Sequence, residues 1–276
     1  MPLLTLPFPD INPVALWLGP FPVKWYGLTY AAGLLLGWTY VKQMLATPRL
    51  WLQDHAPFPP LKSDDLLLFM TFGVVLGGRL GEVFFYHPEF YLAHPAEIHK
   101  VWNGGMSFHG GFVGSIIAIL AFARLNHVSP LTVLDIAAAA TPIGLFLGRI
   151  ANFINGELWG RPSTVAWSMV FPGAGPLPRH PSQLYEAALE GAALFVVCVW
   201  LIHQRQAFKR PGLVAGIFTA GYGLARAFCE FFREPETSHW ANQGFMTPGI
   251  LYSLPMIAVG LYFIYRARIE GRREAT

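Results

Sequence analysis

The stretch that best indicates the fold covers residues 66–86, LLLFMTFGVVLGGRLGEVFFY. It is almost entirely apolar or small over the ~20 residues that a helix needs to cross a bilayer. Backbone groups find no partners in hydrocarbon, so we expect this run to be helical. Gly73, Gly77 and Gly81 recur every four residues and therefore share one helix face. Such a face predicts close packing against a neighbouring helix.

Apolar runs of similar length recur along the chain, and we expect seven membrane-spanning helices. The predicted spans are 23–43, 66–86, 106–125, 131–150, 184–203, 212–232 and 248–267. Composition agrees, because only 13% of the residues are charged, against about 25% in a typical soluble domain. The sequence therefore predicts an all-α polytopic membrane protein with a single domain over residues 1–276. Within it, we expect the long segment 151–183 to form an ordered cap on the outer face.

The lysines and arginines indicate how the chain is oriented in the membrane. With the N-terminus outside, eleven of the 19 basic residues face the inside and five face the outside; Arg79, Arg149 and Arg226 lie in or at the membrane. Inside loops of membrane proteins carry an excess of basic residues. We therefore expect the N-terminus outside and the C-terminus in the cytoplasm. The sequence contains no Lys/Arg-rich stripe and no nucleic-acid-binding motif, so no nucleic-acid partner is expected.

Charged residues inside the predicted spans are the first candidates for function. An arginine at mid-membrane costs about 2.5–3.5 kcal/mol on insertion scales. Arg226, Glu230 and Arg233 share one helix face, where Arg226 could simply pair with Glu230. Arg149 ends the fourth span one turn before Asn152, and snorkelling toward water is the alternative explanation for it. Guanidinium groups bind phosphate in a bidentate way, so Arg149 and Arg226 together predict a phosphate clamp.

One histidine is a candidate acid or base. His109 lies at the outer start of the third span and is followed by two glycines, which allow another group to approach closely. Most lone histidines are structural, but imidazole can exchange protons near neutral pH. His180 is the alternative candidate. The Pro-Ser pair after it is typical of a turn that begins a helix, so we favour a structural role for His180.

Four segments together resemble the prolipoprotein diacylglyceryl transferase family. They are GRIANFINGELWGRPS at 148–163, FHGG at 108–111, RHPSQLYE at 179–186 and RAFCEFFREP at 226–235. They follow in order along nearly the whole chain, and the first is highly specific. The resemblance implies transfer of the diacylglyceryl group of phosphatidylglycerol to the lipobox cysteine of a preprolipoprotein. The products would be a thioether and glycerol phosphate, at the inner membrane of a bacterium, with no metal or other cofactor.

The resemblance also implies which residues carry the activity. Family residues linked to activity or lipid binding match Tyr26, His109, Arg149, Asn152, Glu157, Gly160, Arg226, Glu230 and Arg233. Asn155, in the same segment as Asn152, is a further candidate for substrate binding. We expect His109, Arg149 and Arg226 to be catalytic, and the others, together with Arg149, to bind substrate. The chain departs from the family pattern at Ile250, where glutamine is usual, and at Glu82, where an aromatic residue is common.

Two other classes of protein also place arginines in a helix bundle. A small-solute transporter or channel does so, but it typically shows repeat symmetry or paired broken helices, and the sequence has no clear repeat. A structural membrane protein does not need so many polar groups near one leaflet. Thiol-dependent consumption of phosphatidylglycerol by the purified protein would separate the transferase from both.

Overall fold

The computed structural model describes residues 5–9, 11–234 and 247–273. The described chain is mainly helical, with one hairpin formed by β1 (Val14–Leu18) and β2 (Phe21–Lys24). Its longer helices are α1 (Trp25–Leu45), α2 (Lys62–Gly81), α4 (Phe108–Leu125), α5 (Pro130–Ile154), α7 (Leu194–Arg205), α8 (Leu213–Cys229) and α9 (Pro248–Arg273). Two compact units divide the chain, one made of residues 1–40 and 135–276 and the other of residues 41–134.

A long helical stretch occupies each of the seven predicted spans. The fifth is continuous from the short helix α6 (Ser182–Glu186) through the π-helical turn η6 (Ala187–Ala193) into α7. Within the described residues, five stretches are long and apolar enough to cross a membrane: Lys62–Tyr86, Phe108–Leu125, Pro130–Ile154, Ser182–Arg205 and Pro248–Glu270. Helix α8 is apolar but shorter, and α1 is not among the five. The prediction of a polytopic all-α membrane protein is therefore confirmed, while the number of seven crossings stays a prediction.

In the unit of residues 41–134, α2 packs against α4 along the predicted glycine face. A Cβ atom placed on Gly77 would collide with the main-chain oxygen of Gly110, and one on Gly73 with that of Gly114. The two backbones approach this closely because side chains are absent on both sides. The expected close packing of this face is therefore confirmed.

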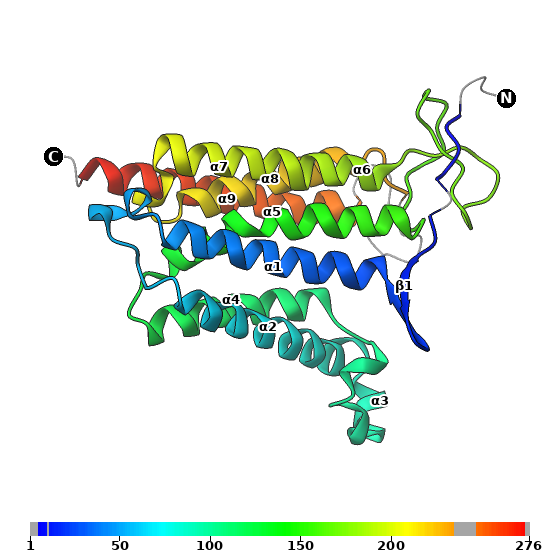
Figure 1. The fold of residues 1–276 in the computed structure, drawn as a ribbon, viewed down its shortest axis with the longest axis horizontal. Helices are drawn as coiled ribbons and strands as arrows, with labels where there is room; N and C mark the ends of the chain where they lie inside the picture. Colours follow the sequence, from blue (N-terminus) through cyan, green and yellow to red (C-terminus); the bar gives the residue numbers. More distant parts are fainter. Residues whose placement is uncertain (1–4, 10, 235–246, 274–276) are drawn as a thin grey trace. The chain divides into compact units, whose positions relative to one another are not determined.

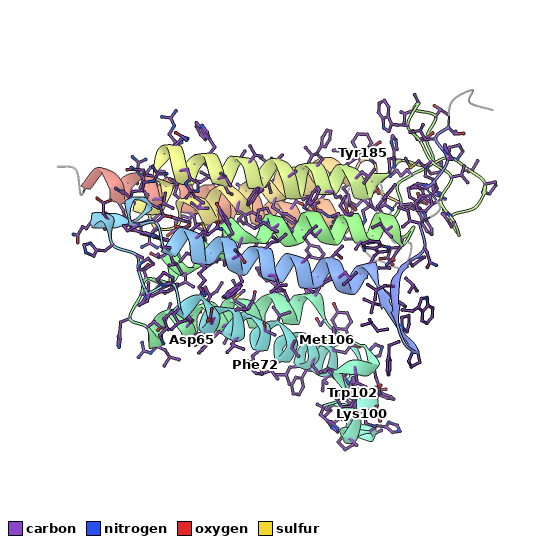
Figure 2. All side chains as sticks on the ribbon, in the orientation of Figure 1. Asp65, Phe72, Lys100, Trp102, Met106 and Tyr185 are labelled. Carbon is purple, nitrogen blue, oxygen red and sulfur yellow. The ribbon has the colours of Figure 1, made fainter. Side chains whose placement is uncertain are left out.

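Arg79, near the end of α2, holds the segment that follows the helix. Its guanidinium donates hydrogen bonds to the main-chain oxygens of Ile98 (2.8 Å), Gly104 (2.7 Å) and Gly105 (2.9 Å). Trp102 belongs to the same segment, and Figure 2 shows it beyond the end of α2. Arg79 is 5% exposed, so its hydrogen bonds compensate for the loss of water around a buried charge. This geometry gives Arg79 a structural role.

In the unit of residues 1–40 and 135–276, helices α5 to α9 lie side by side with the part of α1 that precedes residue 41 (Figure 1). Gly33 of α1 approaches α5 closely, since a Cβ placed on it would lie 3.3 Å from the Cα of Gly144. Asp135 accepts hydrogen bonds from the main-chain nitrogens of Gly212 and Ala215, both at 2.7 Å, and so fixes the start of α8. The start of α1, the end of α5, the start of α6 and the end of α8 lie at one end of this bundle (Figure 1). The candidate residues of this unit therefore gather at that end.

Candidate functional site

Three arginines and three glutamates meet at this end of the bundle. Arg149 comes from α5, and Glu186 and Glu190 come from the stretch that contains α6 and η6. Nε of Arg149 lies 2.9 Å from Oε2 of Glu186, and its Nη2 lies 3.3 Å from Oε2 of Glu190. We call these residues the arginine–glutamate cluster, whose members are Arg149, Glu186, Glu190, Arg226, Glu230 and Arg233.

Glu186 connects the arginines of this cluster. Its Oε1 lies 2.9 Å from Nη1 of Arg226 and 3.2 Å from Nη1 of Arg233. The pair expected within α8 is also present, with Nη2 of Arg226 lying 3.0 Å from Oε2 of Glu230. Arg149 and Arg226, the two residues of the predicted phosphate clamp, thus share one carboxylate although they come from different helices.

Burial separates the two kinds of charge in the cluster. The side chains of Glu186 and Glu190 are 0% exposed, whereas those of Arg149 and Arg226 each keep 17% of their surface accessible. The carboxylates are therefore more deeply buried than the guanidinium groups, which remain partly accessible. Each guanidinium has five N–H donors. The ion pairs of Arg149 involve its Nε and Nη2, and those of Arg226 involve its Nη1 and Nη2. Nη1 of Arg149 and Nε of Arg226 take no part in these ion pairs. The cluster is therefore suited to receive an anion from its arginine side.

Polar residues just after α5 form a second group in the same unit. Nδ2 of Asn152 donates a hydrogen bond to Oε1 of Glu157 at 2.8 Å, and Nδ2 of Asn155 approaches the same oxygen at 3.4 Å. Gln183, which the sequence did not mark as a candidate, donates to the main-chain oxygen of Glu157. Tyr26 lies in the first turn of α1, and its hydroxyl oxygen lies 3.2 Å from that of Tyr30. Three of the sequence-predicted site residues are thus in contact, namely Asn152, Asn155 and Glu157, and Arg149 lies one turn before Asn152 on α5.

Gly160 joins the segment after α5 to the chain that follows α8. Its main-chain nitrogen donates to the main-chain oxygen of His180 at 2.9 Å, and its backbone pairs with that of Arg233. A Cβ placed on Gly160 would lie 2.5 Å from the main-chain oxygen of Phe232. Glycine is required for this close approach. The geometry therefore assigns Gly160 to holding the backbone of Arg233 in place.

His180 is packed among aromatic side chains. Its Nδ1 lies 3.0 Å from the hydroxyl oxygen of Tyr185, and its ring centroid lies 5.1 Å from that of Phe232. Tyr185 belongs to α6, and Figure 2 shows it near the start of the helical stretch that continues into α7. Burial lowers the pKa of His180, because desolvation disfavours the charged imidazolium. A neutral, hydrogen-bonded imidazole agrees with the structural role expected for His180.

His109 belongs to the unit of residues 41–134, whereas the other sequence-predicted site residues belong to the other unit. It is exposed and is the second residue of α4. Its Nδ1 lies 3.2 Å from the hydroxyl oxygen of Tyr86. The Ser107 hydroxyl caps the helix by accepting a hydrogen bond from the main-chain nitrogen of Gly110 at 3.1 Å. The helix start therefore presents the His109 ring at the surface of its unit.

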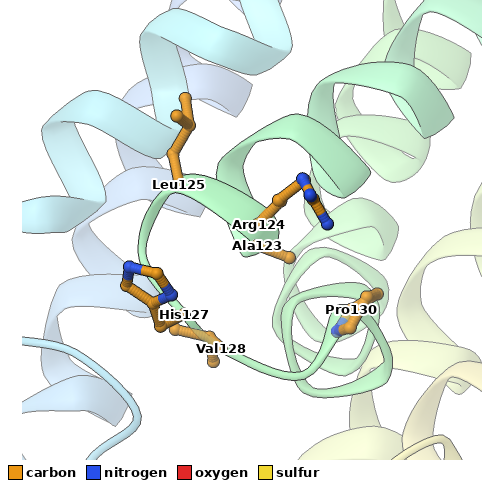
Figure 3. A pocket seen from close by; sticks show the side chains of 6 residues that line it. All are labelled: Ala123, Arg124, Leu125, His127, Val128 and Pro130. Carbon is orange, nitrogen blue, oxygen red and sulfur yellow. The ribbon is translucent and has the colours of Figure 1, made fainter.

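A pocket of about 610 Å³ lies at the other end of α4 (Figure 3). Its lining residues are Ala123, Arg124, Leu125, His127, Val128 and Pro130. Helix α4 has 18 residues, and at 1.5 Å per residue its ends are about 27 Å apart. This pocket is therefore remote from His109.

Two residues of the cluster were missed by the sequence analysis. Glu186 is the last residue of the RHPSQLYE segment, and Glu190 follows four residues later in the same helical stretch. The available signal was their spacing, because carboxylates four residues apart in an apolar helix share a face and are costly in a membrane unless they are paired.

The pair of Arg226 and Glu230 leads to a first prediction. Arg226→Gln and Glu230→Gln should each lower the transfer rate, and the double variant should lose less than the product of the two effects. Contacting residues typically show coupling of about 0.5–3 kcal/mol. The rates of the four proteins form the cycle. The exposed Arg266–Glu270 pair of α9, also spaced i, i+4 at 2.8 Å, is the matched control and should leave the rate unchanged. Full additivity at Arg226 and Glu230 would show that they act independently.

Comparison with known proteins gives a consistent result. The family model described as "Prolipoprotein diacylglyceryl transferase" matches residues 13–266. A protein of Rhizobium meliloti (strain 1021) is 52% identical over 267 residues, which are 96% of this chain and 95% of the relative. One from Beijerinckia indica is 54% identical over 272 residues, 97% of each chain. One from Rhodopseudomonas palustris is 51% identical over 274 residues, 99% of this chain and 95% of the relative. All three carry the name phosphatidylglycerol–prolipoprotein diacylglyceryl transferase.

Proposed function

The chain belongs to the prolipoprotein diacylglyceryl transferase family, and we infer from this that it transfers the diacylglyceryl group of phosphatidylglycerol to prolipoproteins. This reaction is the first step of bacterial lipoprotein maturation. We propose further that the acceptor is the thiol of the lipobox cysteine. The observation that carries the assignment is the arginine–glutamate cluster, because its accessible guanidinium edges suit the anionic headgroup of the lipid.

The chemistry calls for an anion site and a proton acceptor. The thiol sulfur attacks the glyceryl carbon, so a C–S bond forms while the C–O bond to phosphate breaks. The phosphate keeps the electron pair and leaves as glycerol phosphate. Arg149 and Arg226 bind the phosphate and stabilise the charge that develops on it. His109 takes the thiol proton, because the thiolate is the reactive form.

The remaining candidates serve the lipid headgroup. In this proposal, the polar groups after α5, the first turn of α1 and the end of α8 contact or position the glycerol and phosphate of the substrate. These residues are Tyr26, Asn152, Asn155, Glu157, Gly160, Glu230 and Arg233. Residues 1–276 then act as one transferase domain, with residues 151–183 as its outer-face cap.

We propose that the protein lies in the bacterial inner membrane with its N-terminus outside and its C-terminus in the cytoplasm. The distribution of basic residues supports this orientation, and the start of α1 and the end of α9 lie at opposite ends of their bundle (Figure 1). A single cysteine placed before β1 should react with a membrane-impermeant maleimide in intact cells, and one placed after α9 should not. The native Cys198 and Cys229 are buried, so they contribute little labelling. Labelling of the C-terminal cysteine from outside would contradict the proposed orientation.

Formation of the thioether tests the function directly. The purified protein, phosphatidylglycerol and a synthetic peptide with a lipobox cysteine are incubated in detergent micelles. Mass spectrometry should show a peptide that has gained the diacylglyceryl group, together with released glycerol phosphate. The same peptide with serine in place of cysteine is the control and should remain unmodified. Absence of the modified cysteine peptide, with substrate present in excess, would contradict the proposal.

A further inference from the structure

Glu186 contacts all three arginines of the cluster. Both of its oxygens accept contacts from guanidinium groups: Oε2 from Arg149 at 2.9 Å, and Oε1 from Arg226 at 2.9 Å and Arg233 at 3.2 Å. The side chain is 0% exposed. One buried carboxylate thus connects arginines from α5, from α8 and from the chain after α8.

The local backbone brings Glu186 and Glu190 close to α5. The π-helical turn η6 begins directly after Glu186 and carries Glu190. Gly191 of the same turn packs against α5, since a Cβ placed on it would lie 2.6 Å from the Cβ and 2.7 Å from the Cα of Phe146. Phe146 lies one turn before Arg149. Gly191 therefore lets the helical stretch lie close to α5, so that both carboxylates reach Arg149.

The three carboxylates of the cluster balance the formal charge of its three arginines. This balance matters for the reaction because the lipid phosphodiester carries one negative charge, whereas a phosphate monoester carries about −1.5 to −2 at neutral pH. Three uncompensated arginines would bind the leaving glycerol phosphate more tightly than the lipid. Release of product limits the turnover of many enzymes, and tight retention of glycerol phosphate would make it limiting here.

We propose that Glu186 is a positioning residue that holds the three guanidinium groups in place and weakens their hold on glycerol phosphate, so that this product leaves. The proposal rests on the proposed function. In this proposal, Glu186 contacts the three arginines during the reaction and does not contact the reacting atoms. Its effect is therefore on the affinity for the product and on the rate of repeated turnover.

Inhibition by added glycerol phosphate tests this role. Glu186→Gln keeps the shape of the side chain but removes its charge, and it should tighten inhibition by glycerol phosphate about tenfold. A tenfold change corresponds to about 1.4 kcal/mol, which is within reach of one unit charge a few ångströms from the arginines. The multiple-turnover rate should fall while the KM for phosphatidylglycerol does not rise. A purely structural role would instead weaken inhibition and raise the KM.

Two further variants make the result decisive. Glu186→Asp keeps the charge but is too short to reach the arginines on both sides, so it should slow transfer without tightening inhibition. Glu270→Gln, which removes a carboxylate from the exposed pair with Arg266, is the matched control and should change neither quantity. If Glu186→Gln does not yield folded protein, Glu190→Gln should tighten inhibition by a smaller factor, because its contacts of 3.3 and 3.9 Å are longer.

The outcomes separate this inference from the proposed function. A wild-type protein that forms no thioether contradicts the function itself. A wild-type protein that forms it, together with a folded Glu186→Gln variant whose inhibition by glycerol phosphate is unchanged or weaker, overturns only the role of Glu186. The same holds for Glu190→Gln where it is the variant used.

Discussion

Arg149→Ala is expected to abolish diacylglyceryl transfer and to weaken the binding of phosphatidylglycerol. Loss of a single donor to a developing negative charge typically costs about 10²–10³-fold in rate, and this variant loses a whole guanidinium. It also leaves the buried carboxylates of Glu186 and Glu190 without one of their partners. Removing one partner of a buried ion pair destabilises a protein by about 3–5 kcal/mol. Thermal unfolding in detergent must therefore accompany the rate and lipid-binding measurements.

Arg149→Lys distinguishes charge from geometry. Lysine keeps the positive charge but offers a point-like ammonium, which cannot contact Glu186, Glu190 and a phosphate in the planar way of a guanidinium. We expect the lysine variant to remain folded and to transfer poorly. Arg205→Lys is the matched control, because Arg205 is exposed and stacks on Trp200 with 5.0 Å between its Cζ and the ring centroid. Near-wild-type turnover of Arg149→Lys would disprove the bidentate phosphate contact.

Much of the fold could be predicted because a membrane restricts the chain so strongly. Apolar length indicated where each of the seven long helical stretches lies, and glycines at four-residue spacing indicated the face on which α2 meets α4. The hairpin of β1 and β2 was not predicted. Its turn at Gly19-Pro20 was present in the sequence and is a common turn signal, but the surrounding prolines concealed the two short strands.

The candidate site could be predicted only in part, because its partners come from different helices. The spacing of Arg226 and Glu230 within one helix was enough to expect their ion pair. No spacing within one helix could show that Glu186 contacts arginines on α5 and α8 as well. The π-helical turn after Glu186 and the approach of Gly191 to Phe146 favour that contact, and the spacing of charged residues indicates neither of them. Sequence reasoning thus named the arginines and Glu230, and it missed Glu186 and Glu190.

His109→Gln is expected to lower the rate of transfer by about 10²–10⁴-fold, the usual contribution of a general base, while phosphatidylglycerol still binds. Glutamine can retain a hydrogen bond to Tyr86 but cannot accept a proton at neutral pH. His180→Gln is the comparison variant, because His180 packs against the rings of Tyr185 and Phe232 and we expect its role to be structural. It should lower thermal stability more than it lowers the rate per folded molecule. An unchanged rate in His109→Gln would leave thiolate formation to the arginine-rich field or to bulk solvent.

The hydrogen bond to Tyr86 shows how His109 can serve as the base. A neutral imidazole carries one proton, and only the other ring nitrogen can accept a second. If Nδ1 donates to the Tyr86 oxygen, 3.2 Å away, the lone pair of the neutral imidazole lies on Nε2, and this is the nitrogen that takes the thiol proton in the proposal. Tyr86→Phe removes the hydrogen bond that favours the proton on Nδ1 of His109. It should lower the rate by a smaller factor than His109→Gln does.

The dependence of the rate on pH then identifies the group that titrates. In the wild type, the rate should fall as the pH is lowered, since a protonated base cannot accept another proton. His109→Gln should lack this fall, because it has no imidazole at that position. Tyr86→Phe should keep the fall at a lower overall rate, because the imidazole is still present. A fall that persists unchanged in His109→Gln would assign the titration to another group and leave His109 as part of the scaffold at the start of α4.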